Sequence, residues 1–348
     1  MAIRGRSVAA GGLVVVLLFG VVSLLGDMSY EGFRSALPVL VPGGLELSGV
    51  AGLGEVVAWS LRPVTGLLAD RLGAYWGFTV LGYSLIPLGI LIASQGGPMI
   101  ALGYGVERLG KALRSPSRDA LLGGVAGRRR GLVFGLHEAM DQVGAVAGPM
   151  IAYTVFSRGL GLWLLAVPGL FTVPVLLLAR RLCPSRAQPR PKKTGLRDAL
   201  RGGWRASLYV VAAGTLAASP LAVEHVARVL GGVAAGSAPL LYAAAMLSDA
   251  VAAVPLGLLY DHWPRTAAAI PVALGVAAGA AVLIAGGSTA GALLAALLSG
   301  VAEAGFETVA RAMVRGGAAG YGLYGLARGI AAAGSIALYS GIASLVAG

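Results

Sequence analysis

Long apolar segments follow one another along this 348-residue chain, separated by short stretches rich in Gly, Pro or Arg. About 20 apolar residues cross the hydrocarbon of a bilayer as a helix, and most of these segments reach that length. Backbone N–H and C=O groups in hydrocarbon need partners within the protein, which favours helices, and the segments are too uniformly apolar for barrel strands. We predict eleven helices at residues 8–41, 46–69, 75–95, 97–114, 131–155, 159–180, 205–230, 234–260, 267–286, 288–313 and 320–346.

The composition excludes a soluble fold of this size. The chain is 57% hydrophobic and 12% charged, whereas soluble domains carry about 25% charged residues. Cys183 is the only cysteine, so an intrachain disulfide is excluded. The N-terminal MAIRGRS leads into an apolar run far longer than the core of a signal peptide, and we interpret it as the start of the first span.

Lysine and arginine predict the orientation. Most of the 27 basic residues lie in every second connection between the predicted helices, and Lys111, Arg114 and Arg118 are among them. We assign these connections to the cytoplasmic side. The loops on the opposite side hold only Arg158. This asymmetry predicts a cytoplasmic N-terminus in a multi-pass protein of the cytoplasmic (inner or plasma) membrane. The net charge of +12 then lies where anionic lipid lies, so we predict the lipid bilayer as partner and no nucleic acid.

A basic, proline-containing linker divides the chain. We predict an N-terminal six-helix bundle at 1–182, a cytoplasmic linker at 183–204 and a C-terminal five-helix bundle at 205–348. The halves repeat, because GLLAD at 66–70 recurs as GLLYD at 257–261. An even number of spans separates the copies, so both run the same way through the membrane, and a twelfth helix is missing from the second copy.

The ionisable residues within the predicted spans repeat every third helix. A charge at mid-bilayer costs about 2.5–3.5 kcal/mol on insertion scales, so it faces a cavity or a partner. The third, sixth and ninth segments carry none, and the first, fourth, seventh and tenth carry most. We therefore expect these four helices to surround a watery pathway. Their charged residues are Asp27, Glu31 and Arg34, then Glu107, Arg108 and Lys111, then Glu224 and Arg228 with His225, then Glu303, Glu307 and Arg311.

The acids of the first and fifth segments are candidates for proton coupling. Asp27 and Glu31 share a helix face with Arg34, and burial lets a carboxyl take up a proton on one side and release it on the other. A permanent ion pair with Arg34 is the alternative. Glu138 and Asp141 form a second acidic site, for which pairing with Arg108, Lys111 or Arg114 is the alternative.

Charged residues on four of the predicted helices are candidates for the substrate cavity. Because acids and bases are interleaved, the cavity is not a simple trap for cations or anions, and mutual neutralisation is the alternative role. His137, His225 and His262 lack the spacing of metal ligands, so we predict no metal site. We see no nucleophile–base motif of an enzyme and predict no cofactor. The cavity candidates are Glu107, Arg108, Glu224, Arg228, Glu303, Glu307 and Arg328.

Two motifs resemble a known family. GLLADRLG at 66–73 resembles the loop signature of the major facilitator superfamily, and ERLGKALRSPSRDALL at 107–122 with RRGLVFGLHEAMDQVGAVAGP at 129–149 is similar to a bacterial and archaeal permease branch with a GKxxRxPxRDAL stretch. The basic pair that usually ends the loop signature is replaced here by Ala74, Tyr75 and Trp76. The resemblance implies two six-helix bundles, a central cavity lined by helices 1, 4, 7 and 10, and alternating access. It also implies a conformational latch of Gly66, Asp70, Arg71, Arg130, Gly257 and Asp261, with a solvated loop charge as the alternative for its acids.

These patterns predict a secondary active transporter of a small solute, a monomer that exports small organic molecules in exchange for protons. Facilitated uniport, or transport of an inorganic or metal ion, is the first alternative. A receptor or regulatory subunit that does not transport is another, and the membrane half of an ATP-driven pump is a third.

Overall fold

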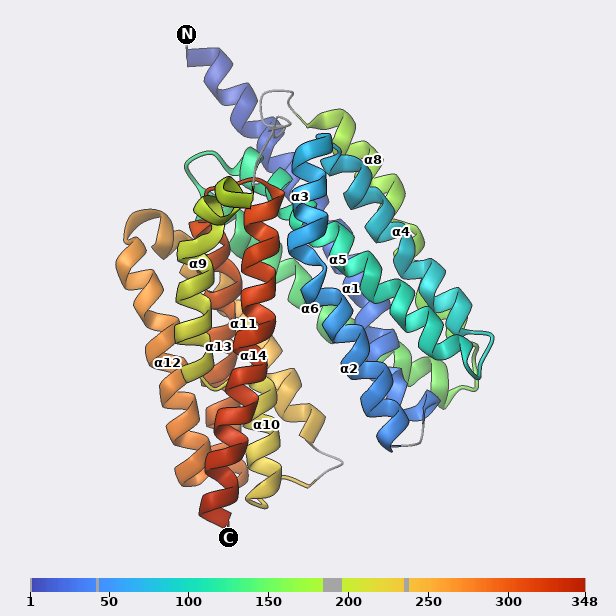
Figure 1. Cartoon of the computed structure of the whole chain (residues 1–348), viewed down its shortest axis with the longest axis vertical. Coiled ribbons are helices and arrows are strands. Elements are labelled where there is room, and N and C mark those ends of the chain that lie inside the picture. The colour runs from blue at the N-terminus through green and yellow to red at the C-terminus, as the bar shows by residue number, and fades with distance from the viewer. Residues whose placement is uncertain (1, 42–43, 184–195, 235–237, 348) are drawn as a thin grey trace. The chain divides into compact units, whose positions relative to one another are not determined.

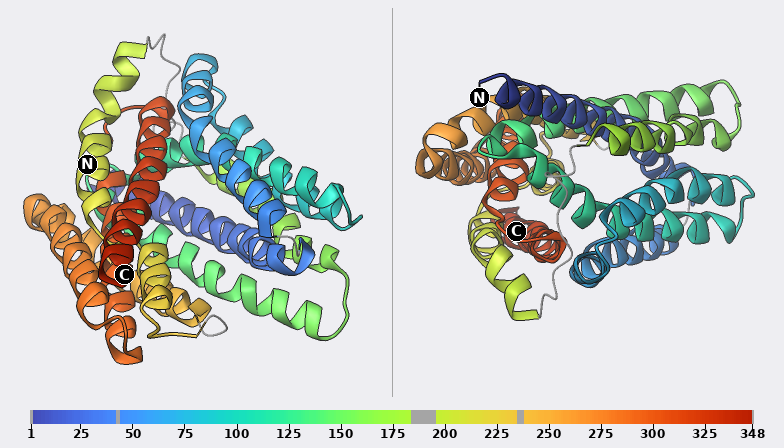
Figure 2. Two further views of the ribbon diagram at one scale, coloured as in Figure 1. Left: turned by 60° about the horizontal axis from the view of Figure 1, so that its bottom comes forward. Right: turned by 90° about the horizontal axis from the view of Figure 1, so that it is seen from above.

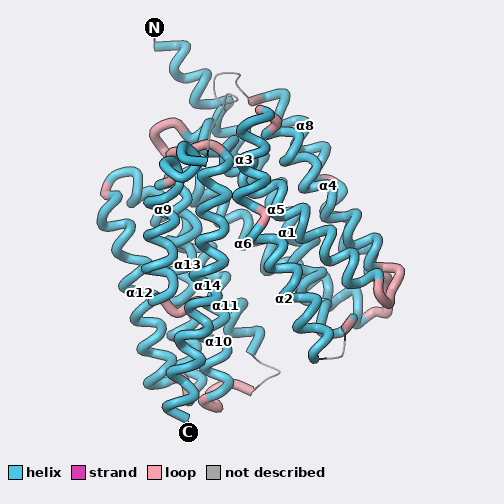
Figure 3. Tube along the Cα trace, viewed as in Figure 1, coloured by secondary structure: helices cyan, strands magenta, loops and turns pink. Residues whose placement is uncertain are grey.

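The computed structural model describes residues 2–41, 44–183, 196–234 and 238–347, and over these ranges the chain is helical (Figures 1 and 3). Within the same ranges, eight helical segments are long and apolar enough to cross a membrane. The all-helical membrane architecture is therefore confirmed, whereas the count of eleven spans and the cytoplasmic N-terminus stay predictions. The elements are α1 (Ala2–Leu40), α2 (Gly44–Ser60), α3 (Arg62–Leu72), α4 (Tyr75–Ala93), α5 (Met99–Ala126), α6 (Arg130–Ser157), η1 (Leu162–Leu165), α7 (Ala166–Leu170), α8 (Thr172–Leu182), α9 (Leu196–Leu216), α10 (Pro220–Val229), α11 (Ala238–His262), α12 (Pro264–Ala285), α13 (Thr289–Met313) and α14 (Ala318–Ala347).

The chain forms two compact units. Unit 1 comprises Met1–Gly127, Met140–Gly203 and Arg315–Gly325, and unit 2 comprises Arg128–Ala139, Trp204–Val314 and Leu326–Gly348. The first turns of α14 therefore belong to unit 1 and the rest of that helix to unit 2. The first turns of α6 belong to unit 2 and the rest of that helix to unit 1. The predicted domain boundaries stay a prediction, and most of the predicted linker lies outside the described residues.

Unit 1 is built around α1 and α5. Helix α5 packs along α4 and also contacts α2 and α3, and α1 packs against α7 and α8. Aromatic rings fill the spaces between these helices: Phe19 stacks on Trp76 with ring centroids 5.5 Å apart, and Phe33 meets Tyr104 edge-on at 5.8 Å. These ring contacts fix the position of α1 relative to α4 and α5.

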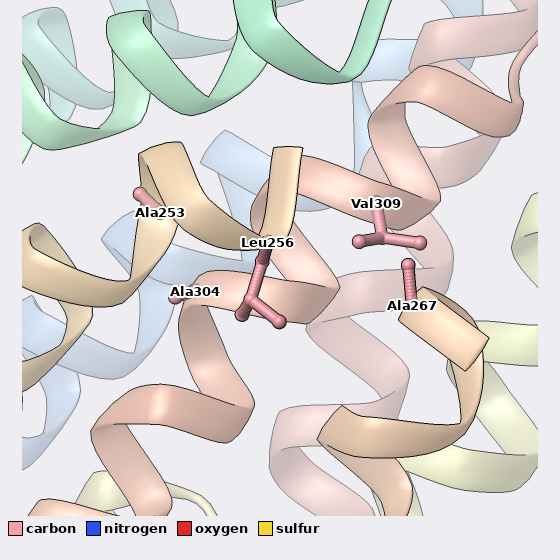
Figure 4. Packing of buried hydrophobic residues seen from close by; sticks show 5 residues of the cluster. All are labelled: Ala253, Leu256, Ala267, Ala304 and Val309. Atoms are coloured by element: carbon pink, nitrogen blue, oxygen red, sulfur yellow. The ribbon is translucent and has the colours of Figure 1, made fainter. Parts of the chain in front are cut away.

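Unit 2 packs through small residues. Helix α13 lies against α11 and α12, and Figure 2 shows the orange helices α12 and α13 side by side. Part of the core joins Ala253 and Leu256 of α11, Ala267 of α12, and Ala304 and Val309 of α13 (Figure 4). Alanine at three of these five positions lets the helix backbones approach closely, as is common in membrane bundles.

Helix α5 extends beyond the fourth predicted span, which was placed at residues 97–114. Helix α5 continues to Ala126, past a proline at position 116. Proline has no N–H to donate to the carbonyl four residues back, and the Thr65 hydroxyl of α3 donates to that Ala112 carbonyl instead, at 2.7 Å. Because the helix continues, Arg114 and Arg118 are buried residues of α5, and their assignment to the cytoplasmic side stays a prediction.

Some of the predicted single spans are interrupted. The span 46–69 divides at Leu61, beside Pro63, into α2 and α3, and the span 205–230 divides between Leu216 and Pro220 into α9 and α10. At the second break Ser219 caps α10 by accepting from the Ala222 N–H, and the Tyr339 hydroxyl donates to the Leu216 carbonyl at 2.7 Å. Side chains of α14 therefore satisfy backbone that the break exposes.

Candidate functional site

A carboxylate at the end of α3 caps the start of α14 within unit 1. Asp70 accepts hydrogen bonds from the N–H groups of Ala318 at 2.8 Å and Ala319 at 2.9 Å. The Tyr75 hydroxyl donates to the same carboxylate at 2.8 Å. One turn earlier, a Cβ on Gly66 would collide with the Ala318 carbonyl, so only glycine allows this approach. The N-terminus of a helix carries a partial positive charge that favours such a carboxylate.

The same contact is repeated in unit 2 at the end of α11. Asp261 accepts from the N–H groups of Gly131 at 2.8 Å and Leu132 at 3.0 Å, at the start of α6. A Cβ on Gly257, one turn earlier, would collide with the Gly131 carbonyl. The repeated Gly-x-x-x-Asp pattern therefore produces the same local geometry in both units.

Arg130 and Arg71 occupy different environments. The Arg130 guanidinium, at the first residue of α6, donates to the carbonyls of Ala312 at 3.0 Å and Val314 at 2.6 Å, where α13 ends. Cations stabilise such helix C-termini. Arg71 is exposed at the end of α3.

Arg108 is at the centre of a buried network in unit 1. Its side chain is fully buried, pairs with Glu107 of its own helix at 2.5 Å, and reaches Glu55 of α2 at 3.0 Å. The guanidinium also faces the rings of Tyr30 and Tyr104, each with its centroid 5.0 Å away. Such cation–π contacts contribute about 2 kcal/mol when desolvated.

Two further arginines extend this network. Arg114 binds the second oxygen of Glu107 at 3.3 Å. Arg34 of α1 pairs with Glu31 at 3.5 Å and lies 3.8 Å from Glu55. The structure therefore contains the Glu31–Arg34 ion pair that the sequence offered as the alternative to proton coupling.

Asp27 and Asp141 lie together in another part of unit 1. The Ser23 hydroxyl donates to Asp141 of α6, and Asp27 lies one turn after Ser23 on α1. Arg118 contacts the Ser23 hydroxyl at 3.4 Å and forms an ion pair with its neighbour Asp119 at 2.9 Å. Helices α1, α5 and α6 therefore bring these side chains into one group.

In unit 2, two arginines hold three glutamates. Arg311 of α13 binds Glu138 of α6 at 3.0 Å and also Glu307, and Arg328 of α14 binds Glu307 at 2.9 Å and also Glu303. Each glutamate contacts an arginine, which supports mutual neutralisation of these cavity candidates. Glu138 and Asp141, predicted as one acidic site, belong to different units.

A small pocket adjoins this unit 2 network. Its volume is about 10 Å³, roughly enough for one water molecule. Glu303 and Arg328 line it together with the interrupted backbone around Ser219.

The predicted pair on α10 is weaker than the other ion pairs of unit 2. Glu224 and Arg228 are 4.0 Å apart, and the Arg228 side chain is 49% exposed, so this pair lies at the weak limit of an ion pair.

Several residues of these networks were not predicted from the sequence. Arg118 and Asp119 were outside the predicted span, although a helix continuing through RDALL would have buried them. Glu55 of α2 was not predicted as a site residue. Among the described residues, no group of three or more His, Cys, Asp or Glu side chains could hold a metal ion.

Comparison with known proteins identifies the family. The family model described as Major Facilitator Superfamily matches residues 19–336. The chain belongs to this superfamily. It is accordingly a membrane transporter rather than an enzyme, and the narrower permease branch with its GKxxRxPxRDAL stretch stays a prediction.

Sequence relatives of this MFS protein occur in bacteria and archaea. The chain is 37% identical over 285 residues to an uncharacterized protein of Mycobacterium tuberculosis, covering 74% of this chain and 68% of the relative. It is 31% identical over 183 residues to an uncharacterized MFS-type transporter of Methanocaldococcus jannaschii, covering 49% of this chain and 46% of that protein.

Solved MFS structures share the fold. The human organic anion transporter MFSD10 superimposes with a TM-score of 0.71 at 17% identity, covering 97% of this chain and 93% of its own. A bacterial homologue of the iron transporter ferroportin gives 0.69 at 18% identity, with 95% of each chain covered. At such identities the likeness concerns the fold alone.

Proposed function

We propose that this protein is a proton-coupled exporter that moves small organic molecules across the cytoplasmic membrane by alternating access. It acts as a monomer with a cytoplasmic N-terminus. The family supports transport by a multi-pass membrane protein, and the internal repeat supports two related halves.

The observation that carries proton coupling is the concentration of ionisable side chains in the two networks. In unit 1, carboxylates on α1, α2, α5 and α6 lie among basic groups of α1, α3 and α5. In unit 2, three glutamates contact two arginines. The unit 1 groups are Asp27, Glu31, Glu55, Glu107, Asp119 and Asp141 with Arg34, Arg62, Arg108, Lys111, Arg114 and Arg118.

A charged carboxylate inside the membrane is costly, and binding of a cation lowers that cost. A proton is the smallest cation that can fill this role. If its uptake and release occur from opposite sides of the membrane, its movement is linked to the movement of the solute.

The two capping contacts serve as gates in this proposal. Asp70 and Asp261 each hold a helix N-terminus through two backbone N–H groups. In the alternate state these contacts separate, and the glycines at positions 66 and 257 allow them to close again without steric conflict. Arg130, anchored to the end of α13, is part of the second gate.

Flux into liposomes tests this function. Purified protein is first screened by thermal shift against neutral, anionic and cationic organic solutes. The solute that stabilises it most is then assayed for flux in vesicles with and without an imposed pH gradient. The proposal expects flux that accelerates when protons flow in the opposite direction to the solute.

Other results select the alternatives. Flux that ignores the gradient supports uniport and contradicts proton coupling. Binding without flux supports a receptor or regulatory subunit. Protein that becomes active only after addition of an ATPase subunit and ATP supports the membrane half of a pump.

A further inference from the structure

We propose that Lys111 of α5 binds the anionic group of the transported solute, which makes the solute a small organic anion with a carboxylate, phosphate or sulfonate group. Transport of this anion rests on the proposed function, whereas its binding to Lys111 does not. Lys111 is not among the cavity candidates chosen from the sequence, so the assignment adds a residue to the substrate site.

Three cations of α5 face one aromatic ring of α1. The Lys111 ammonium lies 4.3 Å from the centroid of the Tyr30 ring. The guanidinium groups of Arg108 and Arg114 lie 5.0 Å and 5.4 Å from the same centroid. The Lys111 ammonium also donates to the Tyr30 hydroxyl at 3.0 Å. Because Tyr30 is 6% exposed, it is held by the packing of unit 1 and fixes the position of the ammonium.

These three cations differ in their partners. Arg108 pairs with Glu107 and with Glu55. Arg114 pairs with Glu107 as well. Among the residues that the structure describes, no carboxylate lies within ion-pair distance of the Lys111 ammonium, whose direct contacts are the hydroxyl and the ring of a neutral tyrosine. Removing a charged group from water is costly unless an opposite charge contacts it, and an anionic solute supplies that contact.

The three cations also differ in accessibility. Arg108 is fully buried and Arg114 is 2% exposed, whereas Lys111 is partly exposed. A solute can therefore reach the ammonium of Lys111 without displacing an ion pair of the protein. Accessibility and the lack of a contacting carboxylate thus select the same member of the cluster.

Acids near Lys111 act on it at longer range. Asp27 and Glu31 of α1 and Glu55 of α2 attract the ammonium from beyond ion-pair distance, and Arg62 of α3 repels it. Glu31 and Glu55 each contact an arginine directly. Because negative charge nearby weakens the hold on an anion, Lys111 binds the solute without trapping it. A transport site needs this balance, since the solute must also leave.

Matched solutes that differ in charge test the assignment on the wild type. Thermal unfolding of the purified protein in a neutral detergent is measured with increasing benzoate, benzenesulfonate, benzamide and benzylamine. A ligand that binds the folded protein alone raises the unfolding temperature in a saturable manner. Stabilisation is expected from at least one of the two anions and from neither the neutral amide nor the cationic amine. Stabilisation by the amide or the amine to the same extent, or by none of the four, overturns the proposal.

Lysine variants then locate the anion. The chain has three lysines, at positions 111, 192 and 193. Lys111→Gln is expected to weaken binding of the anion by about tenfold to a hundredfold, the range of one charge-assisted hydrogen bond. It is also expected to fold, because it leaves no contacting carboxylate unpaired. Lys111→Arg keeps a cation and should retain part of the binding.

Lys192→Gln is the matched control, because it removes the same charge elsewhere in the chain. Its binding of the anion is expected to equal that of the wild type. Unchanged binding in Lys111→Gln overturns the proposal. An equal loss in Lys111→Gln and Lys192→Gln would indicate a general effect of net charge and overturns it as well.

Anionic lipid headgroups carry the same chemistry as the solute. Phosphatidylglycerol is therefore added to the detergent micelles in a separate titration. If it stabilises the wild type through Lys111 and neither benzoate nor benzenesulfonate displaces it, the site belongs to a lipid and the assignment to the solute is overturned. Displacement by either anion supports the solute.

Binding and transport can fail separately. Anion binding that requires Lys111, together with no flux in liposomes, would retain the site and reject the proposed transport. Flux of a neutral solute that Lys111→Gln leaves unchanged would retain transport and reject the proposal for Lys111.

Discussion

The two units of this transporter repeat one polar contact and differ in another. Both contain a Gly-x-x-x-Asp helix end that caps a neighbouring helix through two N–H groups. Their buried charges are arranged differently, because in unit 1 two arginines share Glu107, whereas in unit 2 Arg311 and Arg328 each hold two glutamates.

This difference shows that charge balance alone does not locate a proton. A guanidinium with five donors can serve two carboxylates at once. Arg311 and Arg328 do so in unit 2. In unit 1 one carboxylate, Glu107, serves both Arg108 and Arg114.

The largest expected effect comes from removing the central arginine of unit 1. Arg108→Ala leaves Glu107 and Glu55 without their shared partner, and loss of one member of a buried pair costs about 3–5 kcal/mol. Arg34→Ala is the control, because the Arg34 side chain is 32% exposed, and its loss should cost at most about 1 kcal/mol. Thermal unfolding in detergent measures both. Equal effects would contradict a network centred on Arg108.

Replacing one glutamate in each unit compares the two networks directly. Glu107→Gln removes the charge shared by Arg108 and Arg114, and is expected to destabilise by about 2 kcal/mol. Glu303→Gln removes one carboxylate while Glu307 still holds both arginines of unit 2, so a change below about 1 kcal/mol is expected. The same unfolding assay applies. A larger cost for Glu303→Gln would show that unit 2 depends on all three carboxylates.

The repeated glycines should respond alike. Gly66→Ala and Gly257→Ala each place a methyl group against a backbone carbonyl, and such overpacking costs about 1–3 kcal/mol. Gly105→Ala in α5 has open space around the new methyl and should be neutral or stabilising by up to about 1 kcal/mol. A harmful substitution in only one unit would break the equivalence of the two capping contacts.

The smallest effect concerns the single thiol. Burial raises the pKa of Cys183 in unit 1, so little reactive thiolate exists at neutral pH and labelling should accelerate as the pH rises. Trp263→Cys in a Cys183→Ser background places a thiol at an exposed position of unit 2 and should label rapidly at neutral pH. Mass spectrometry after maleimide treatment measures both rates. Equally fast labelling at neutral pH would show that Cys183 is accessible.

Local sequence patterns were sufficient to predict some of the helix ends in this structure. The GLLAD and GLLYD repeat predicted two equivalent helix ends, because glycine and aspartate four residues apart share one face. Ser219 followed by Pro220 is a typical helix start and could have predicted the break between α9 and α10. The end of α5 was missed because Arg118 and Asp119 were treated as loop residues, although packing against α1 and α4 keeps them helical.

The partners of buried charges could not be predicted in this way. Glu138 and Arg311 are separated by 173 positions in the chain, and their contact depends on how α6 packs against α13. Glu138 and Asp141 are three positions apart and nevertheless join different units. Spacing along one helix identifies a shared face, but only tertiary packing decides which opposite charge meets it.

Solute flux in liposomes tests the central claim most directly. The purified wild type is assayed with the solute that stabilises it most, with and without a pH gradient that drives protons in the direction opposite to the solute. The account predicts that the gradient accelerates flux. Flux that ignores the gradient would contradict the account.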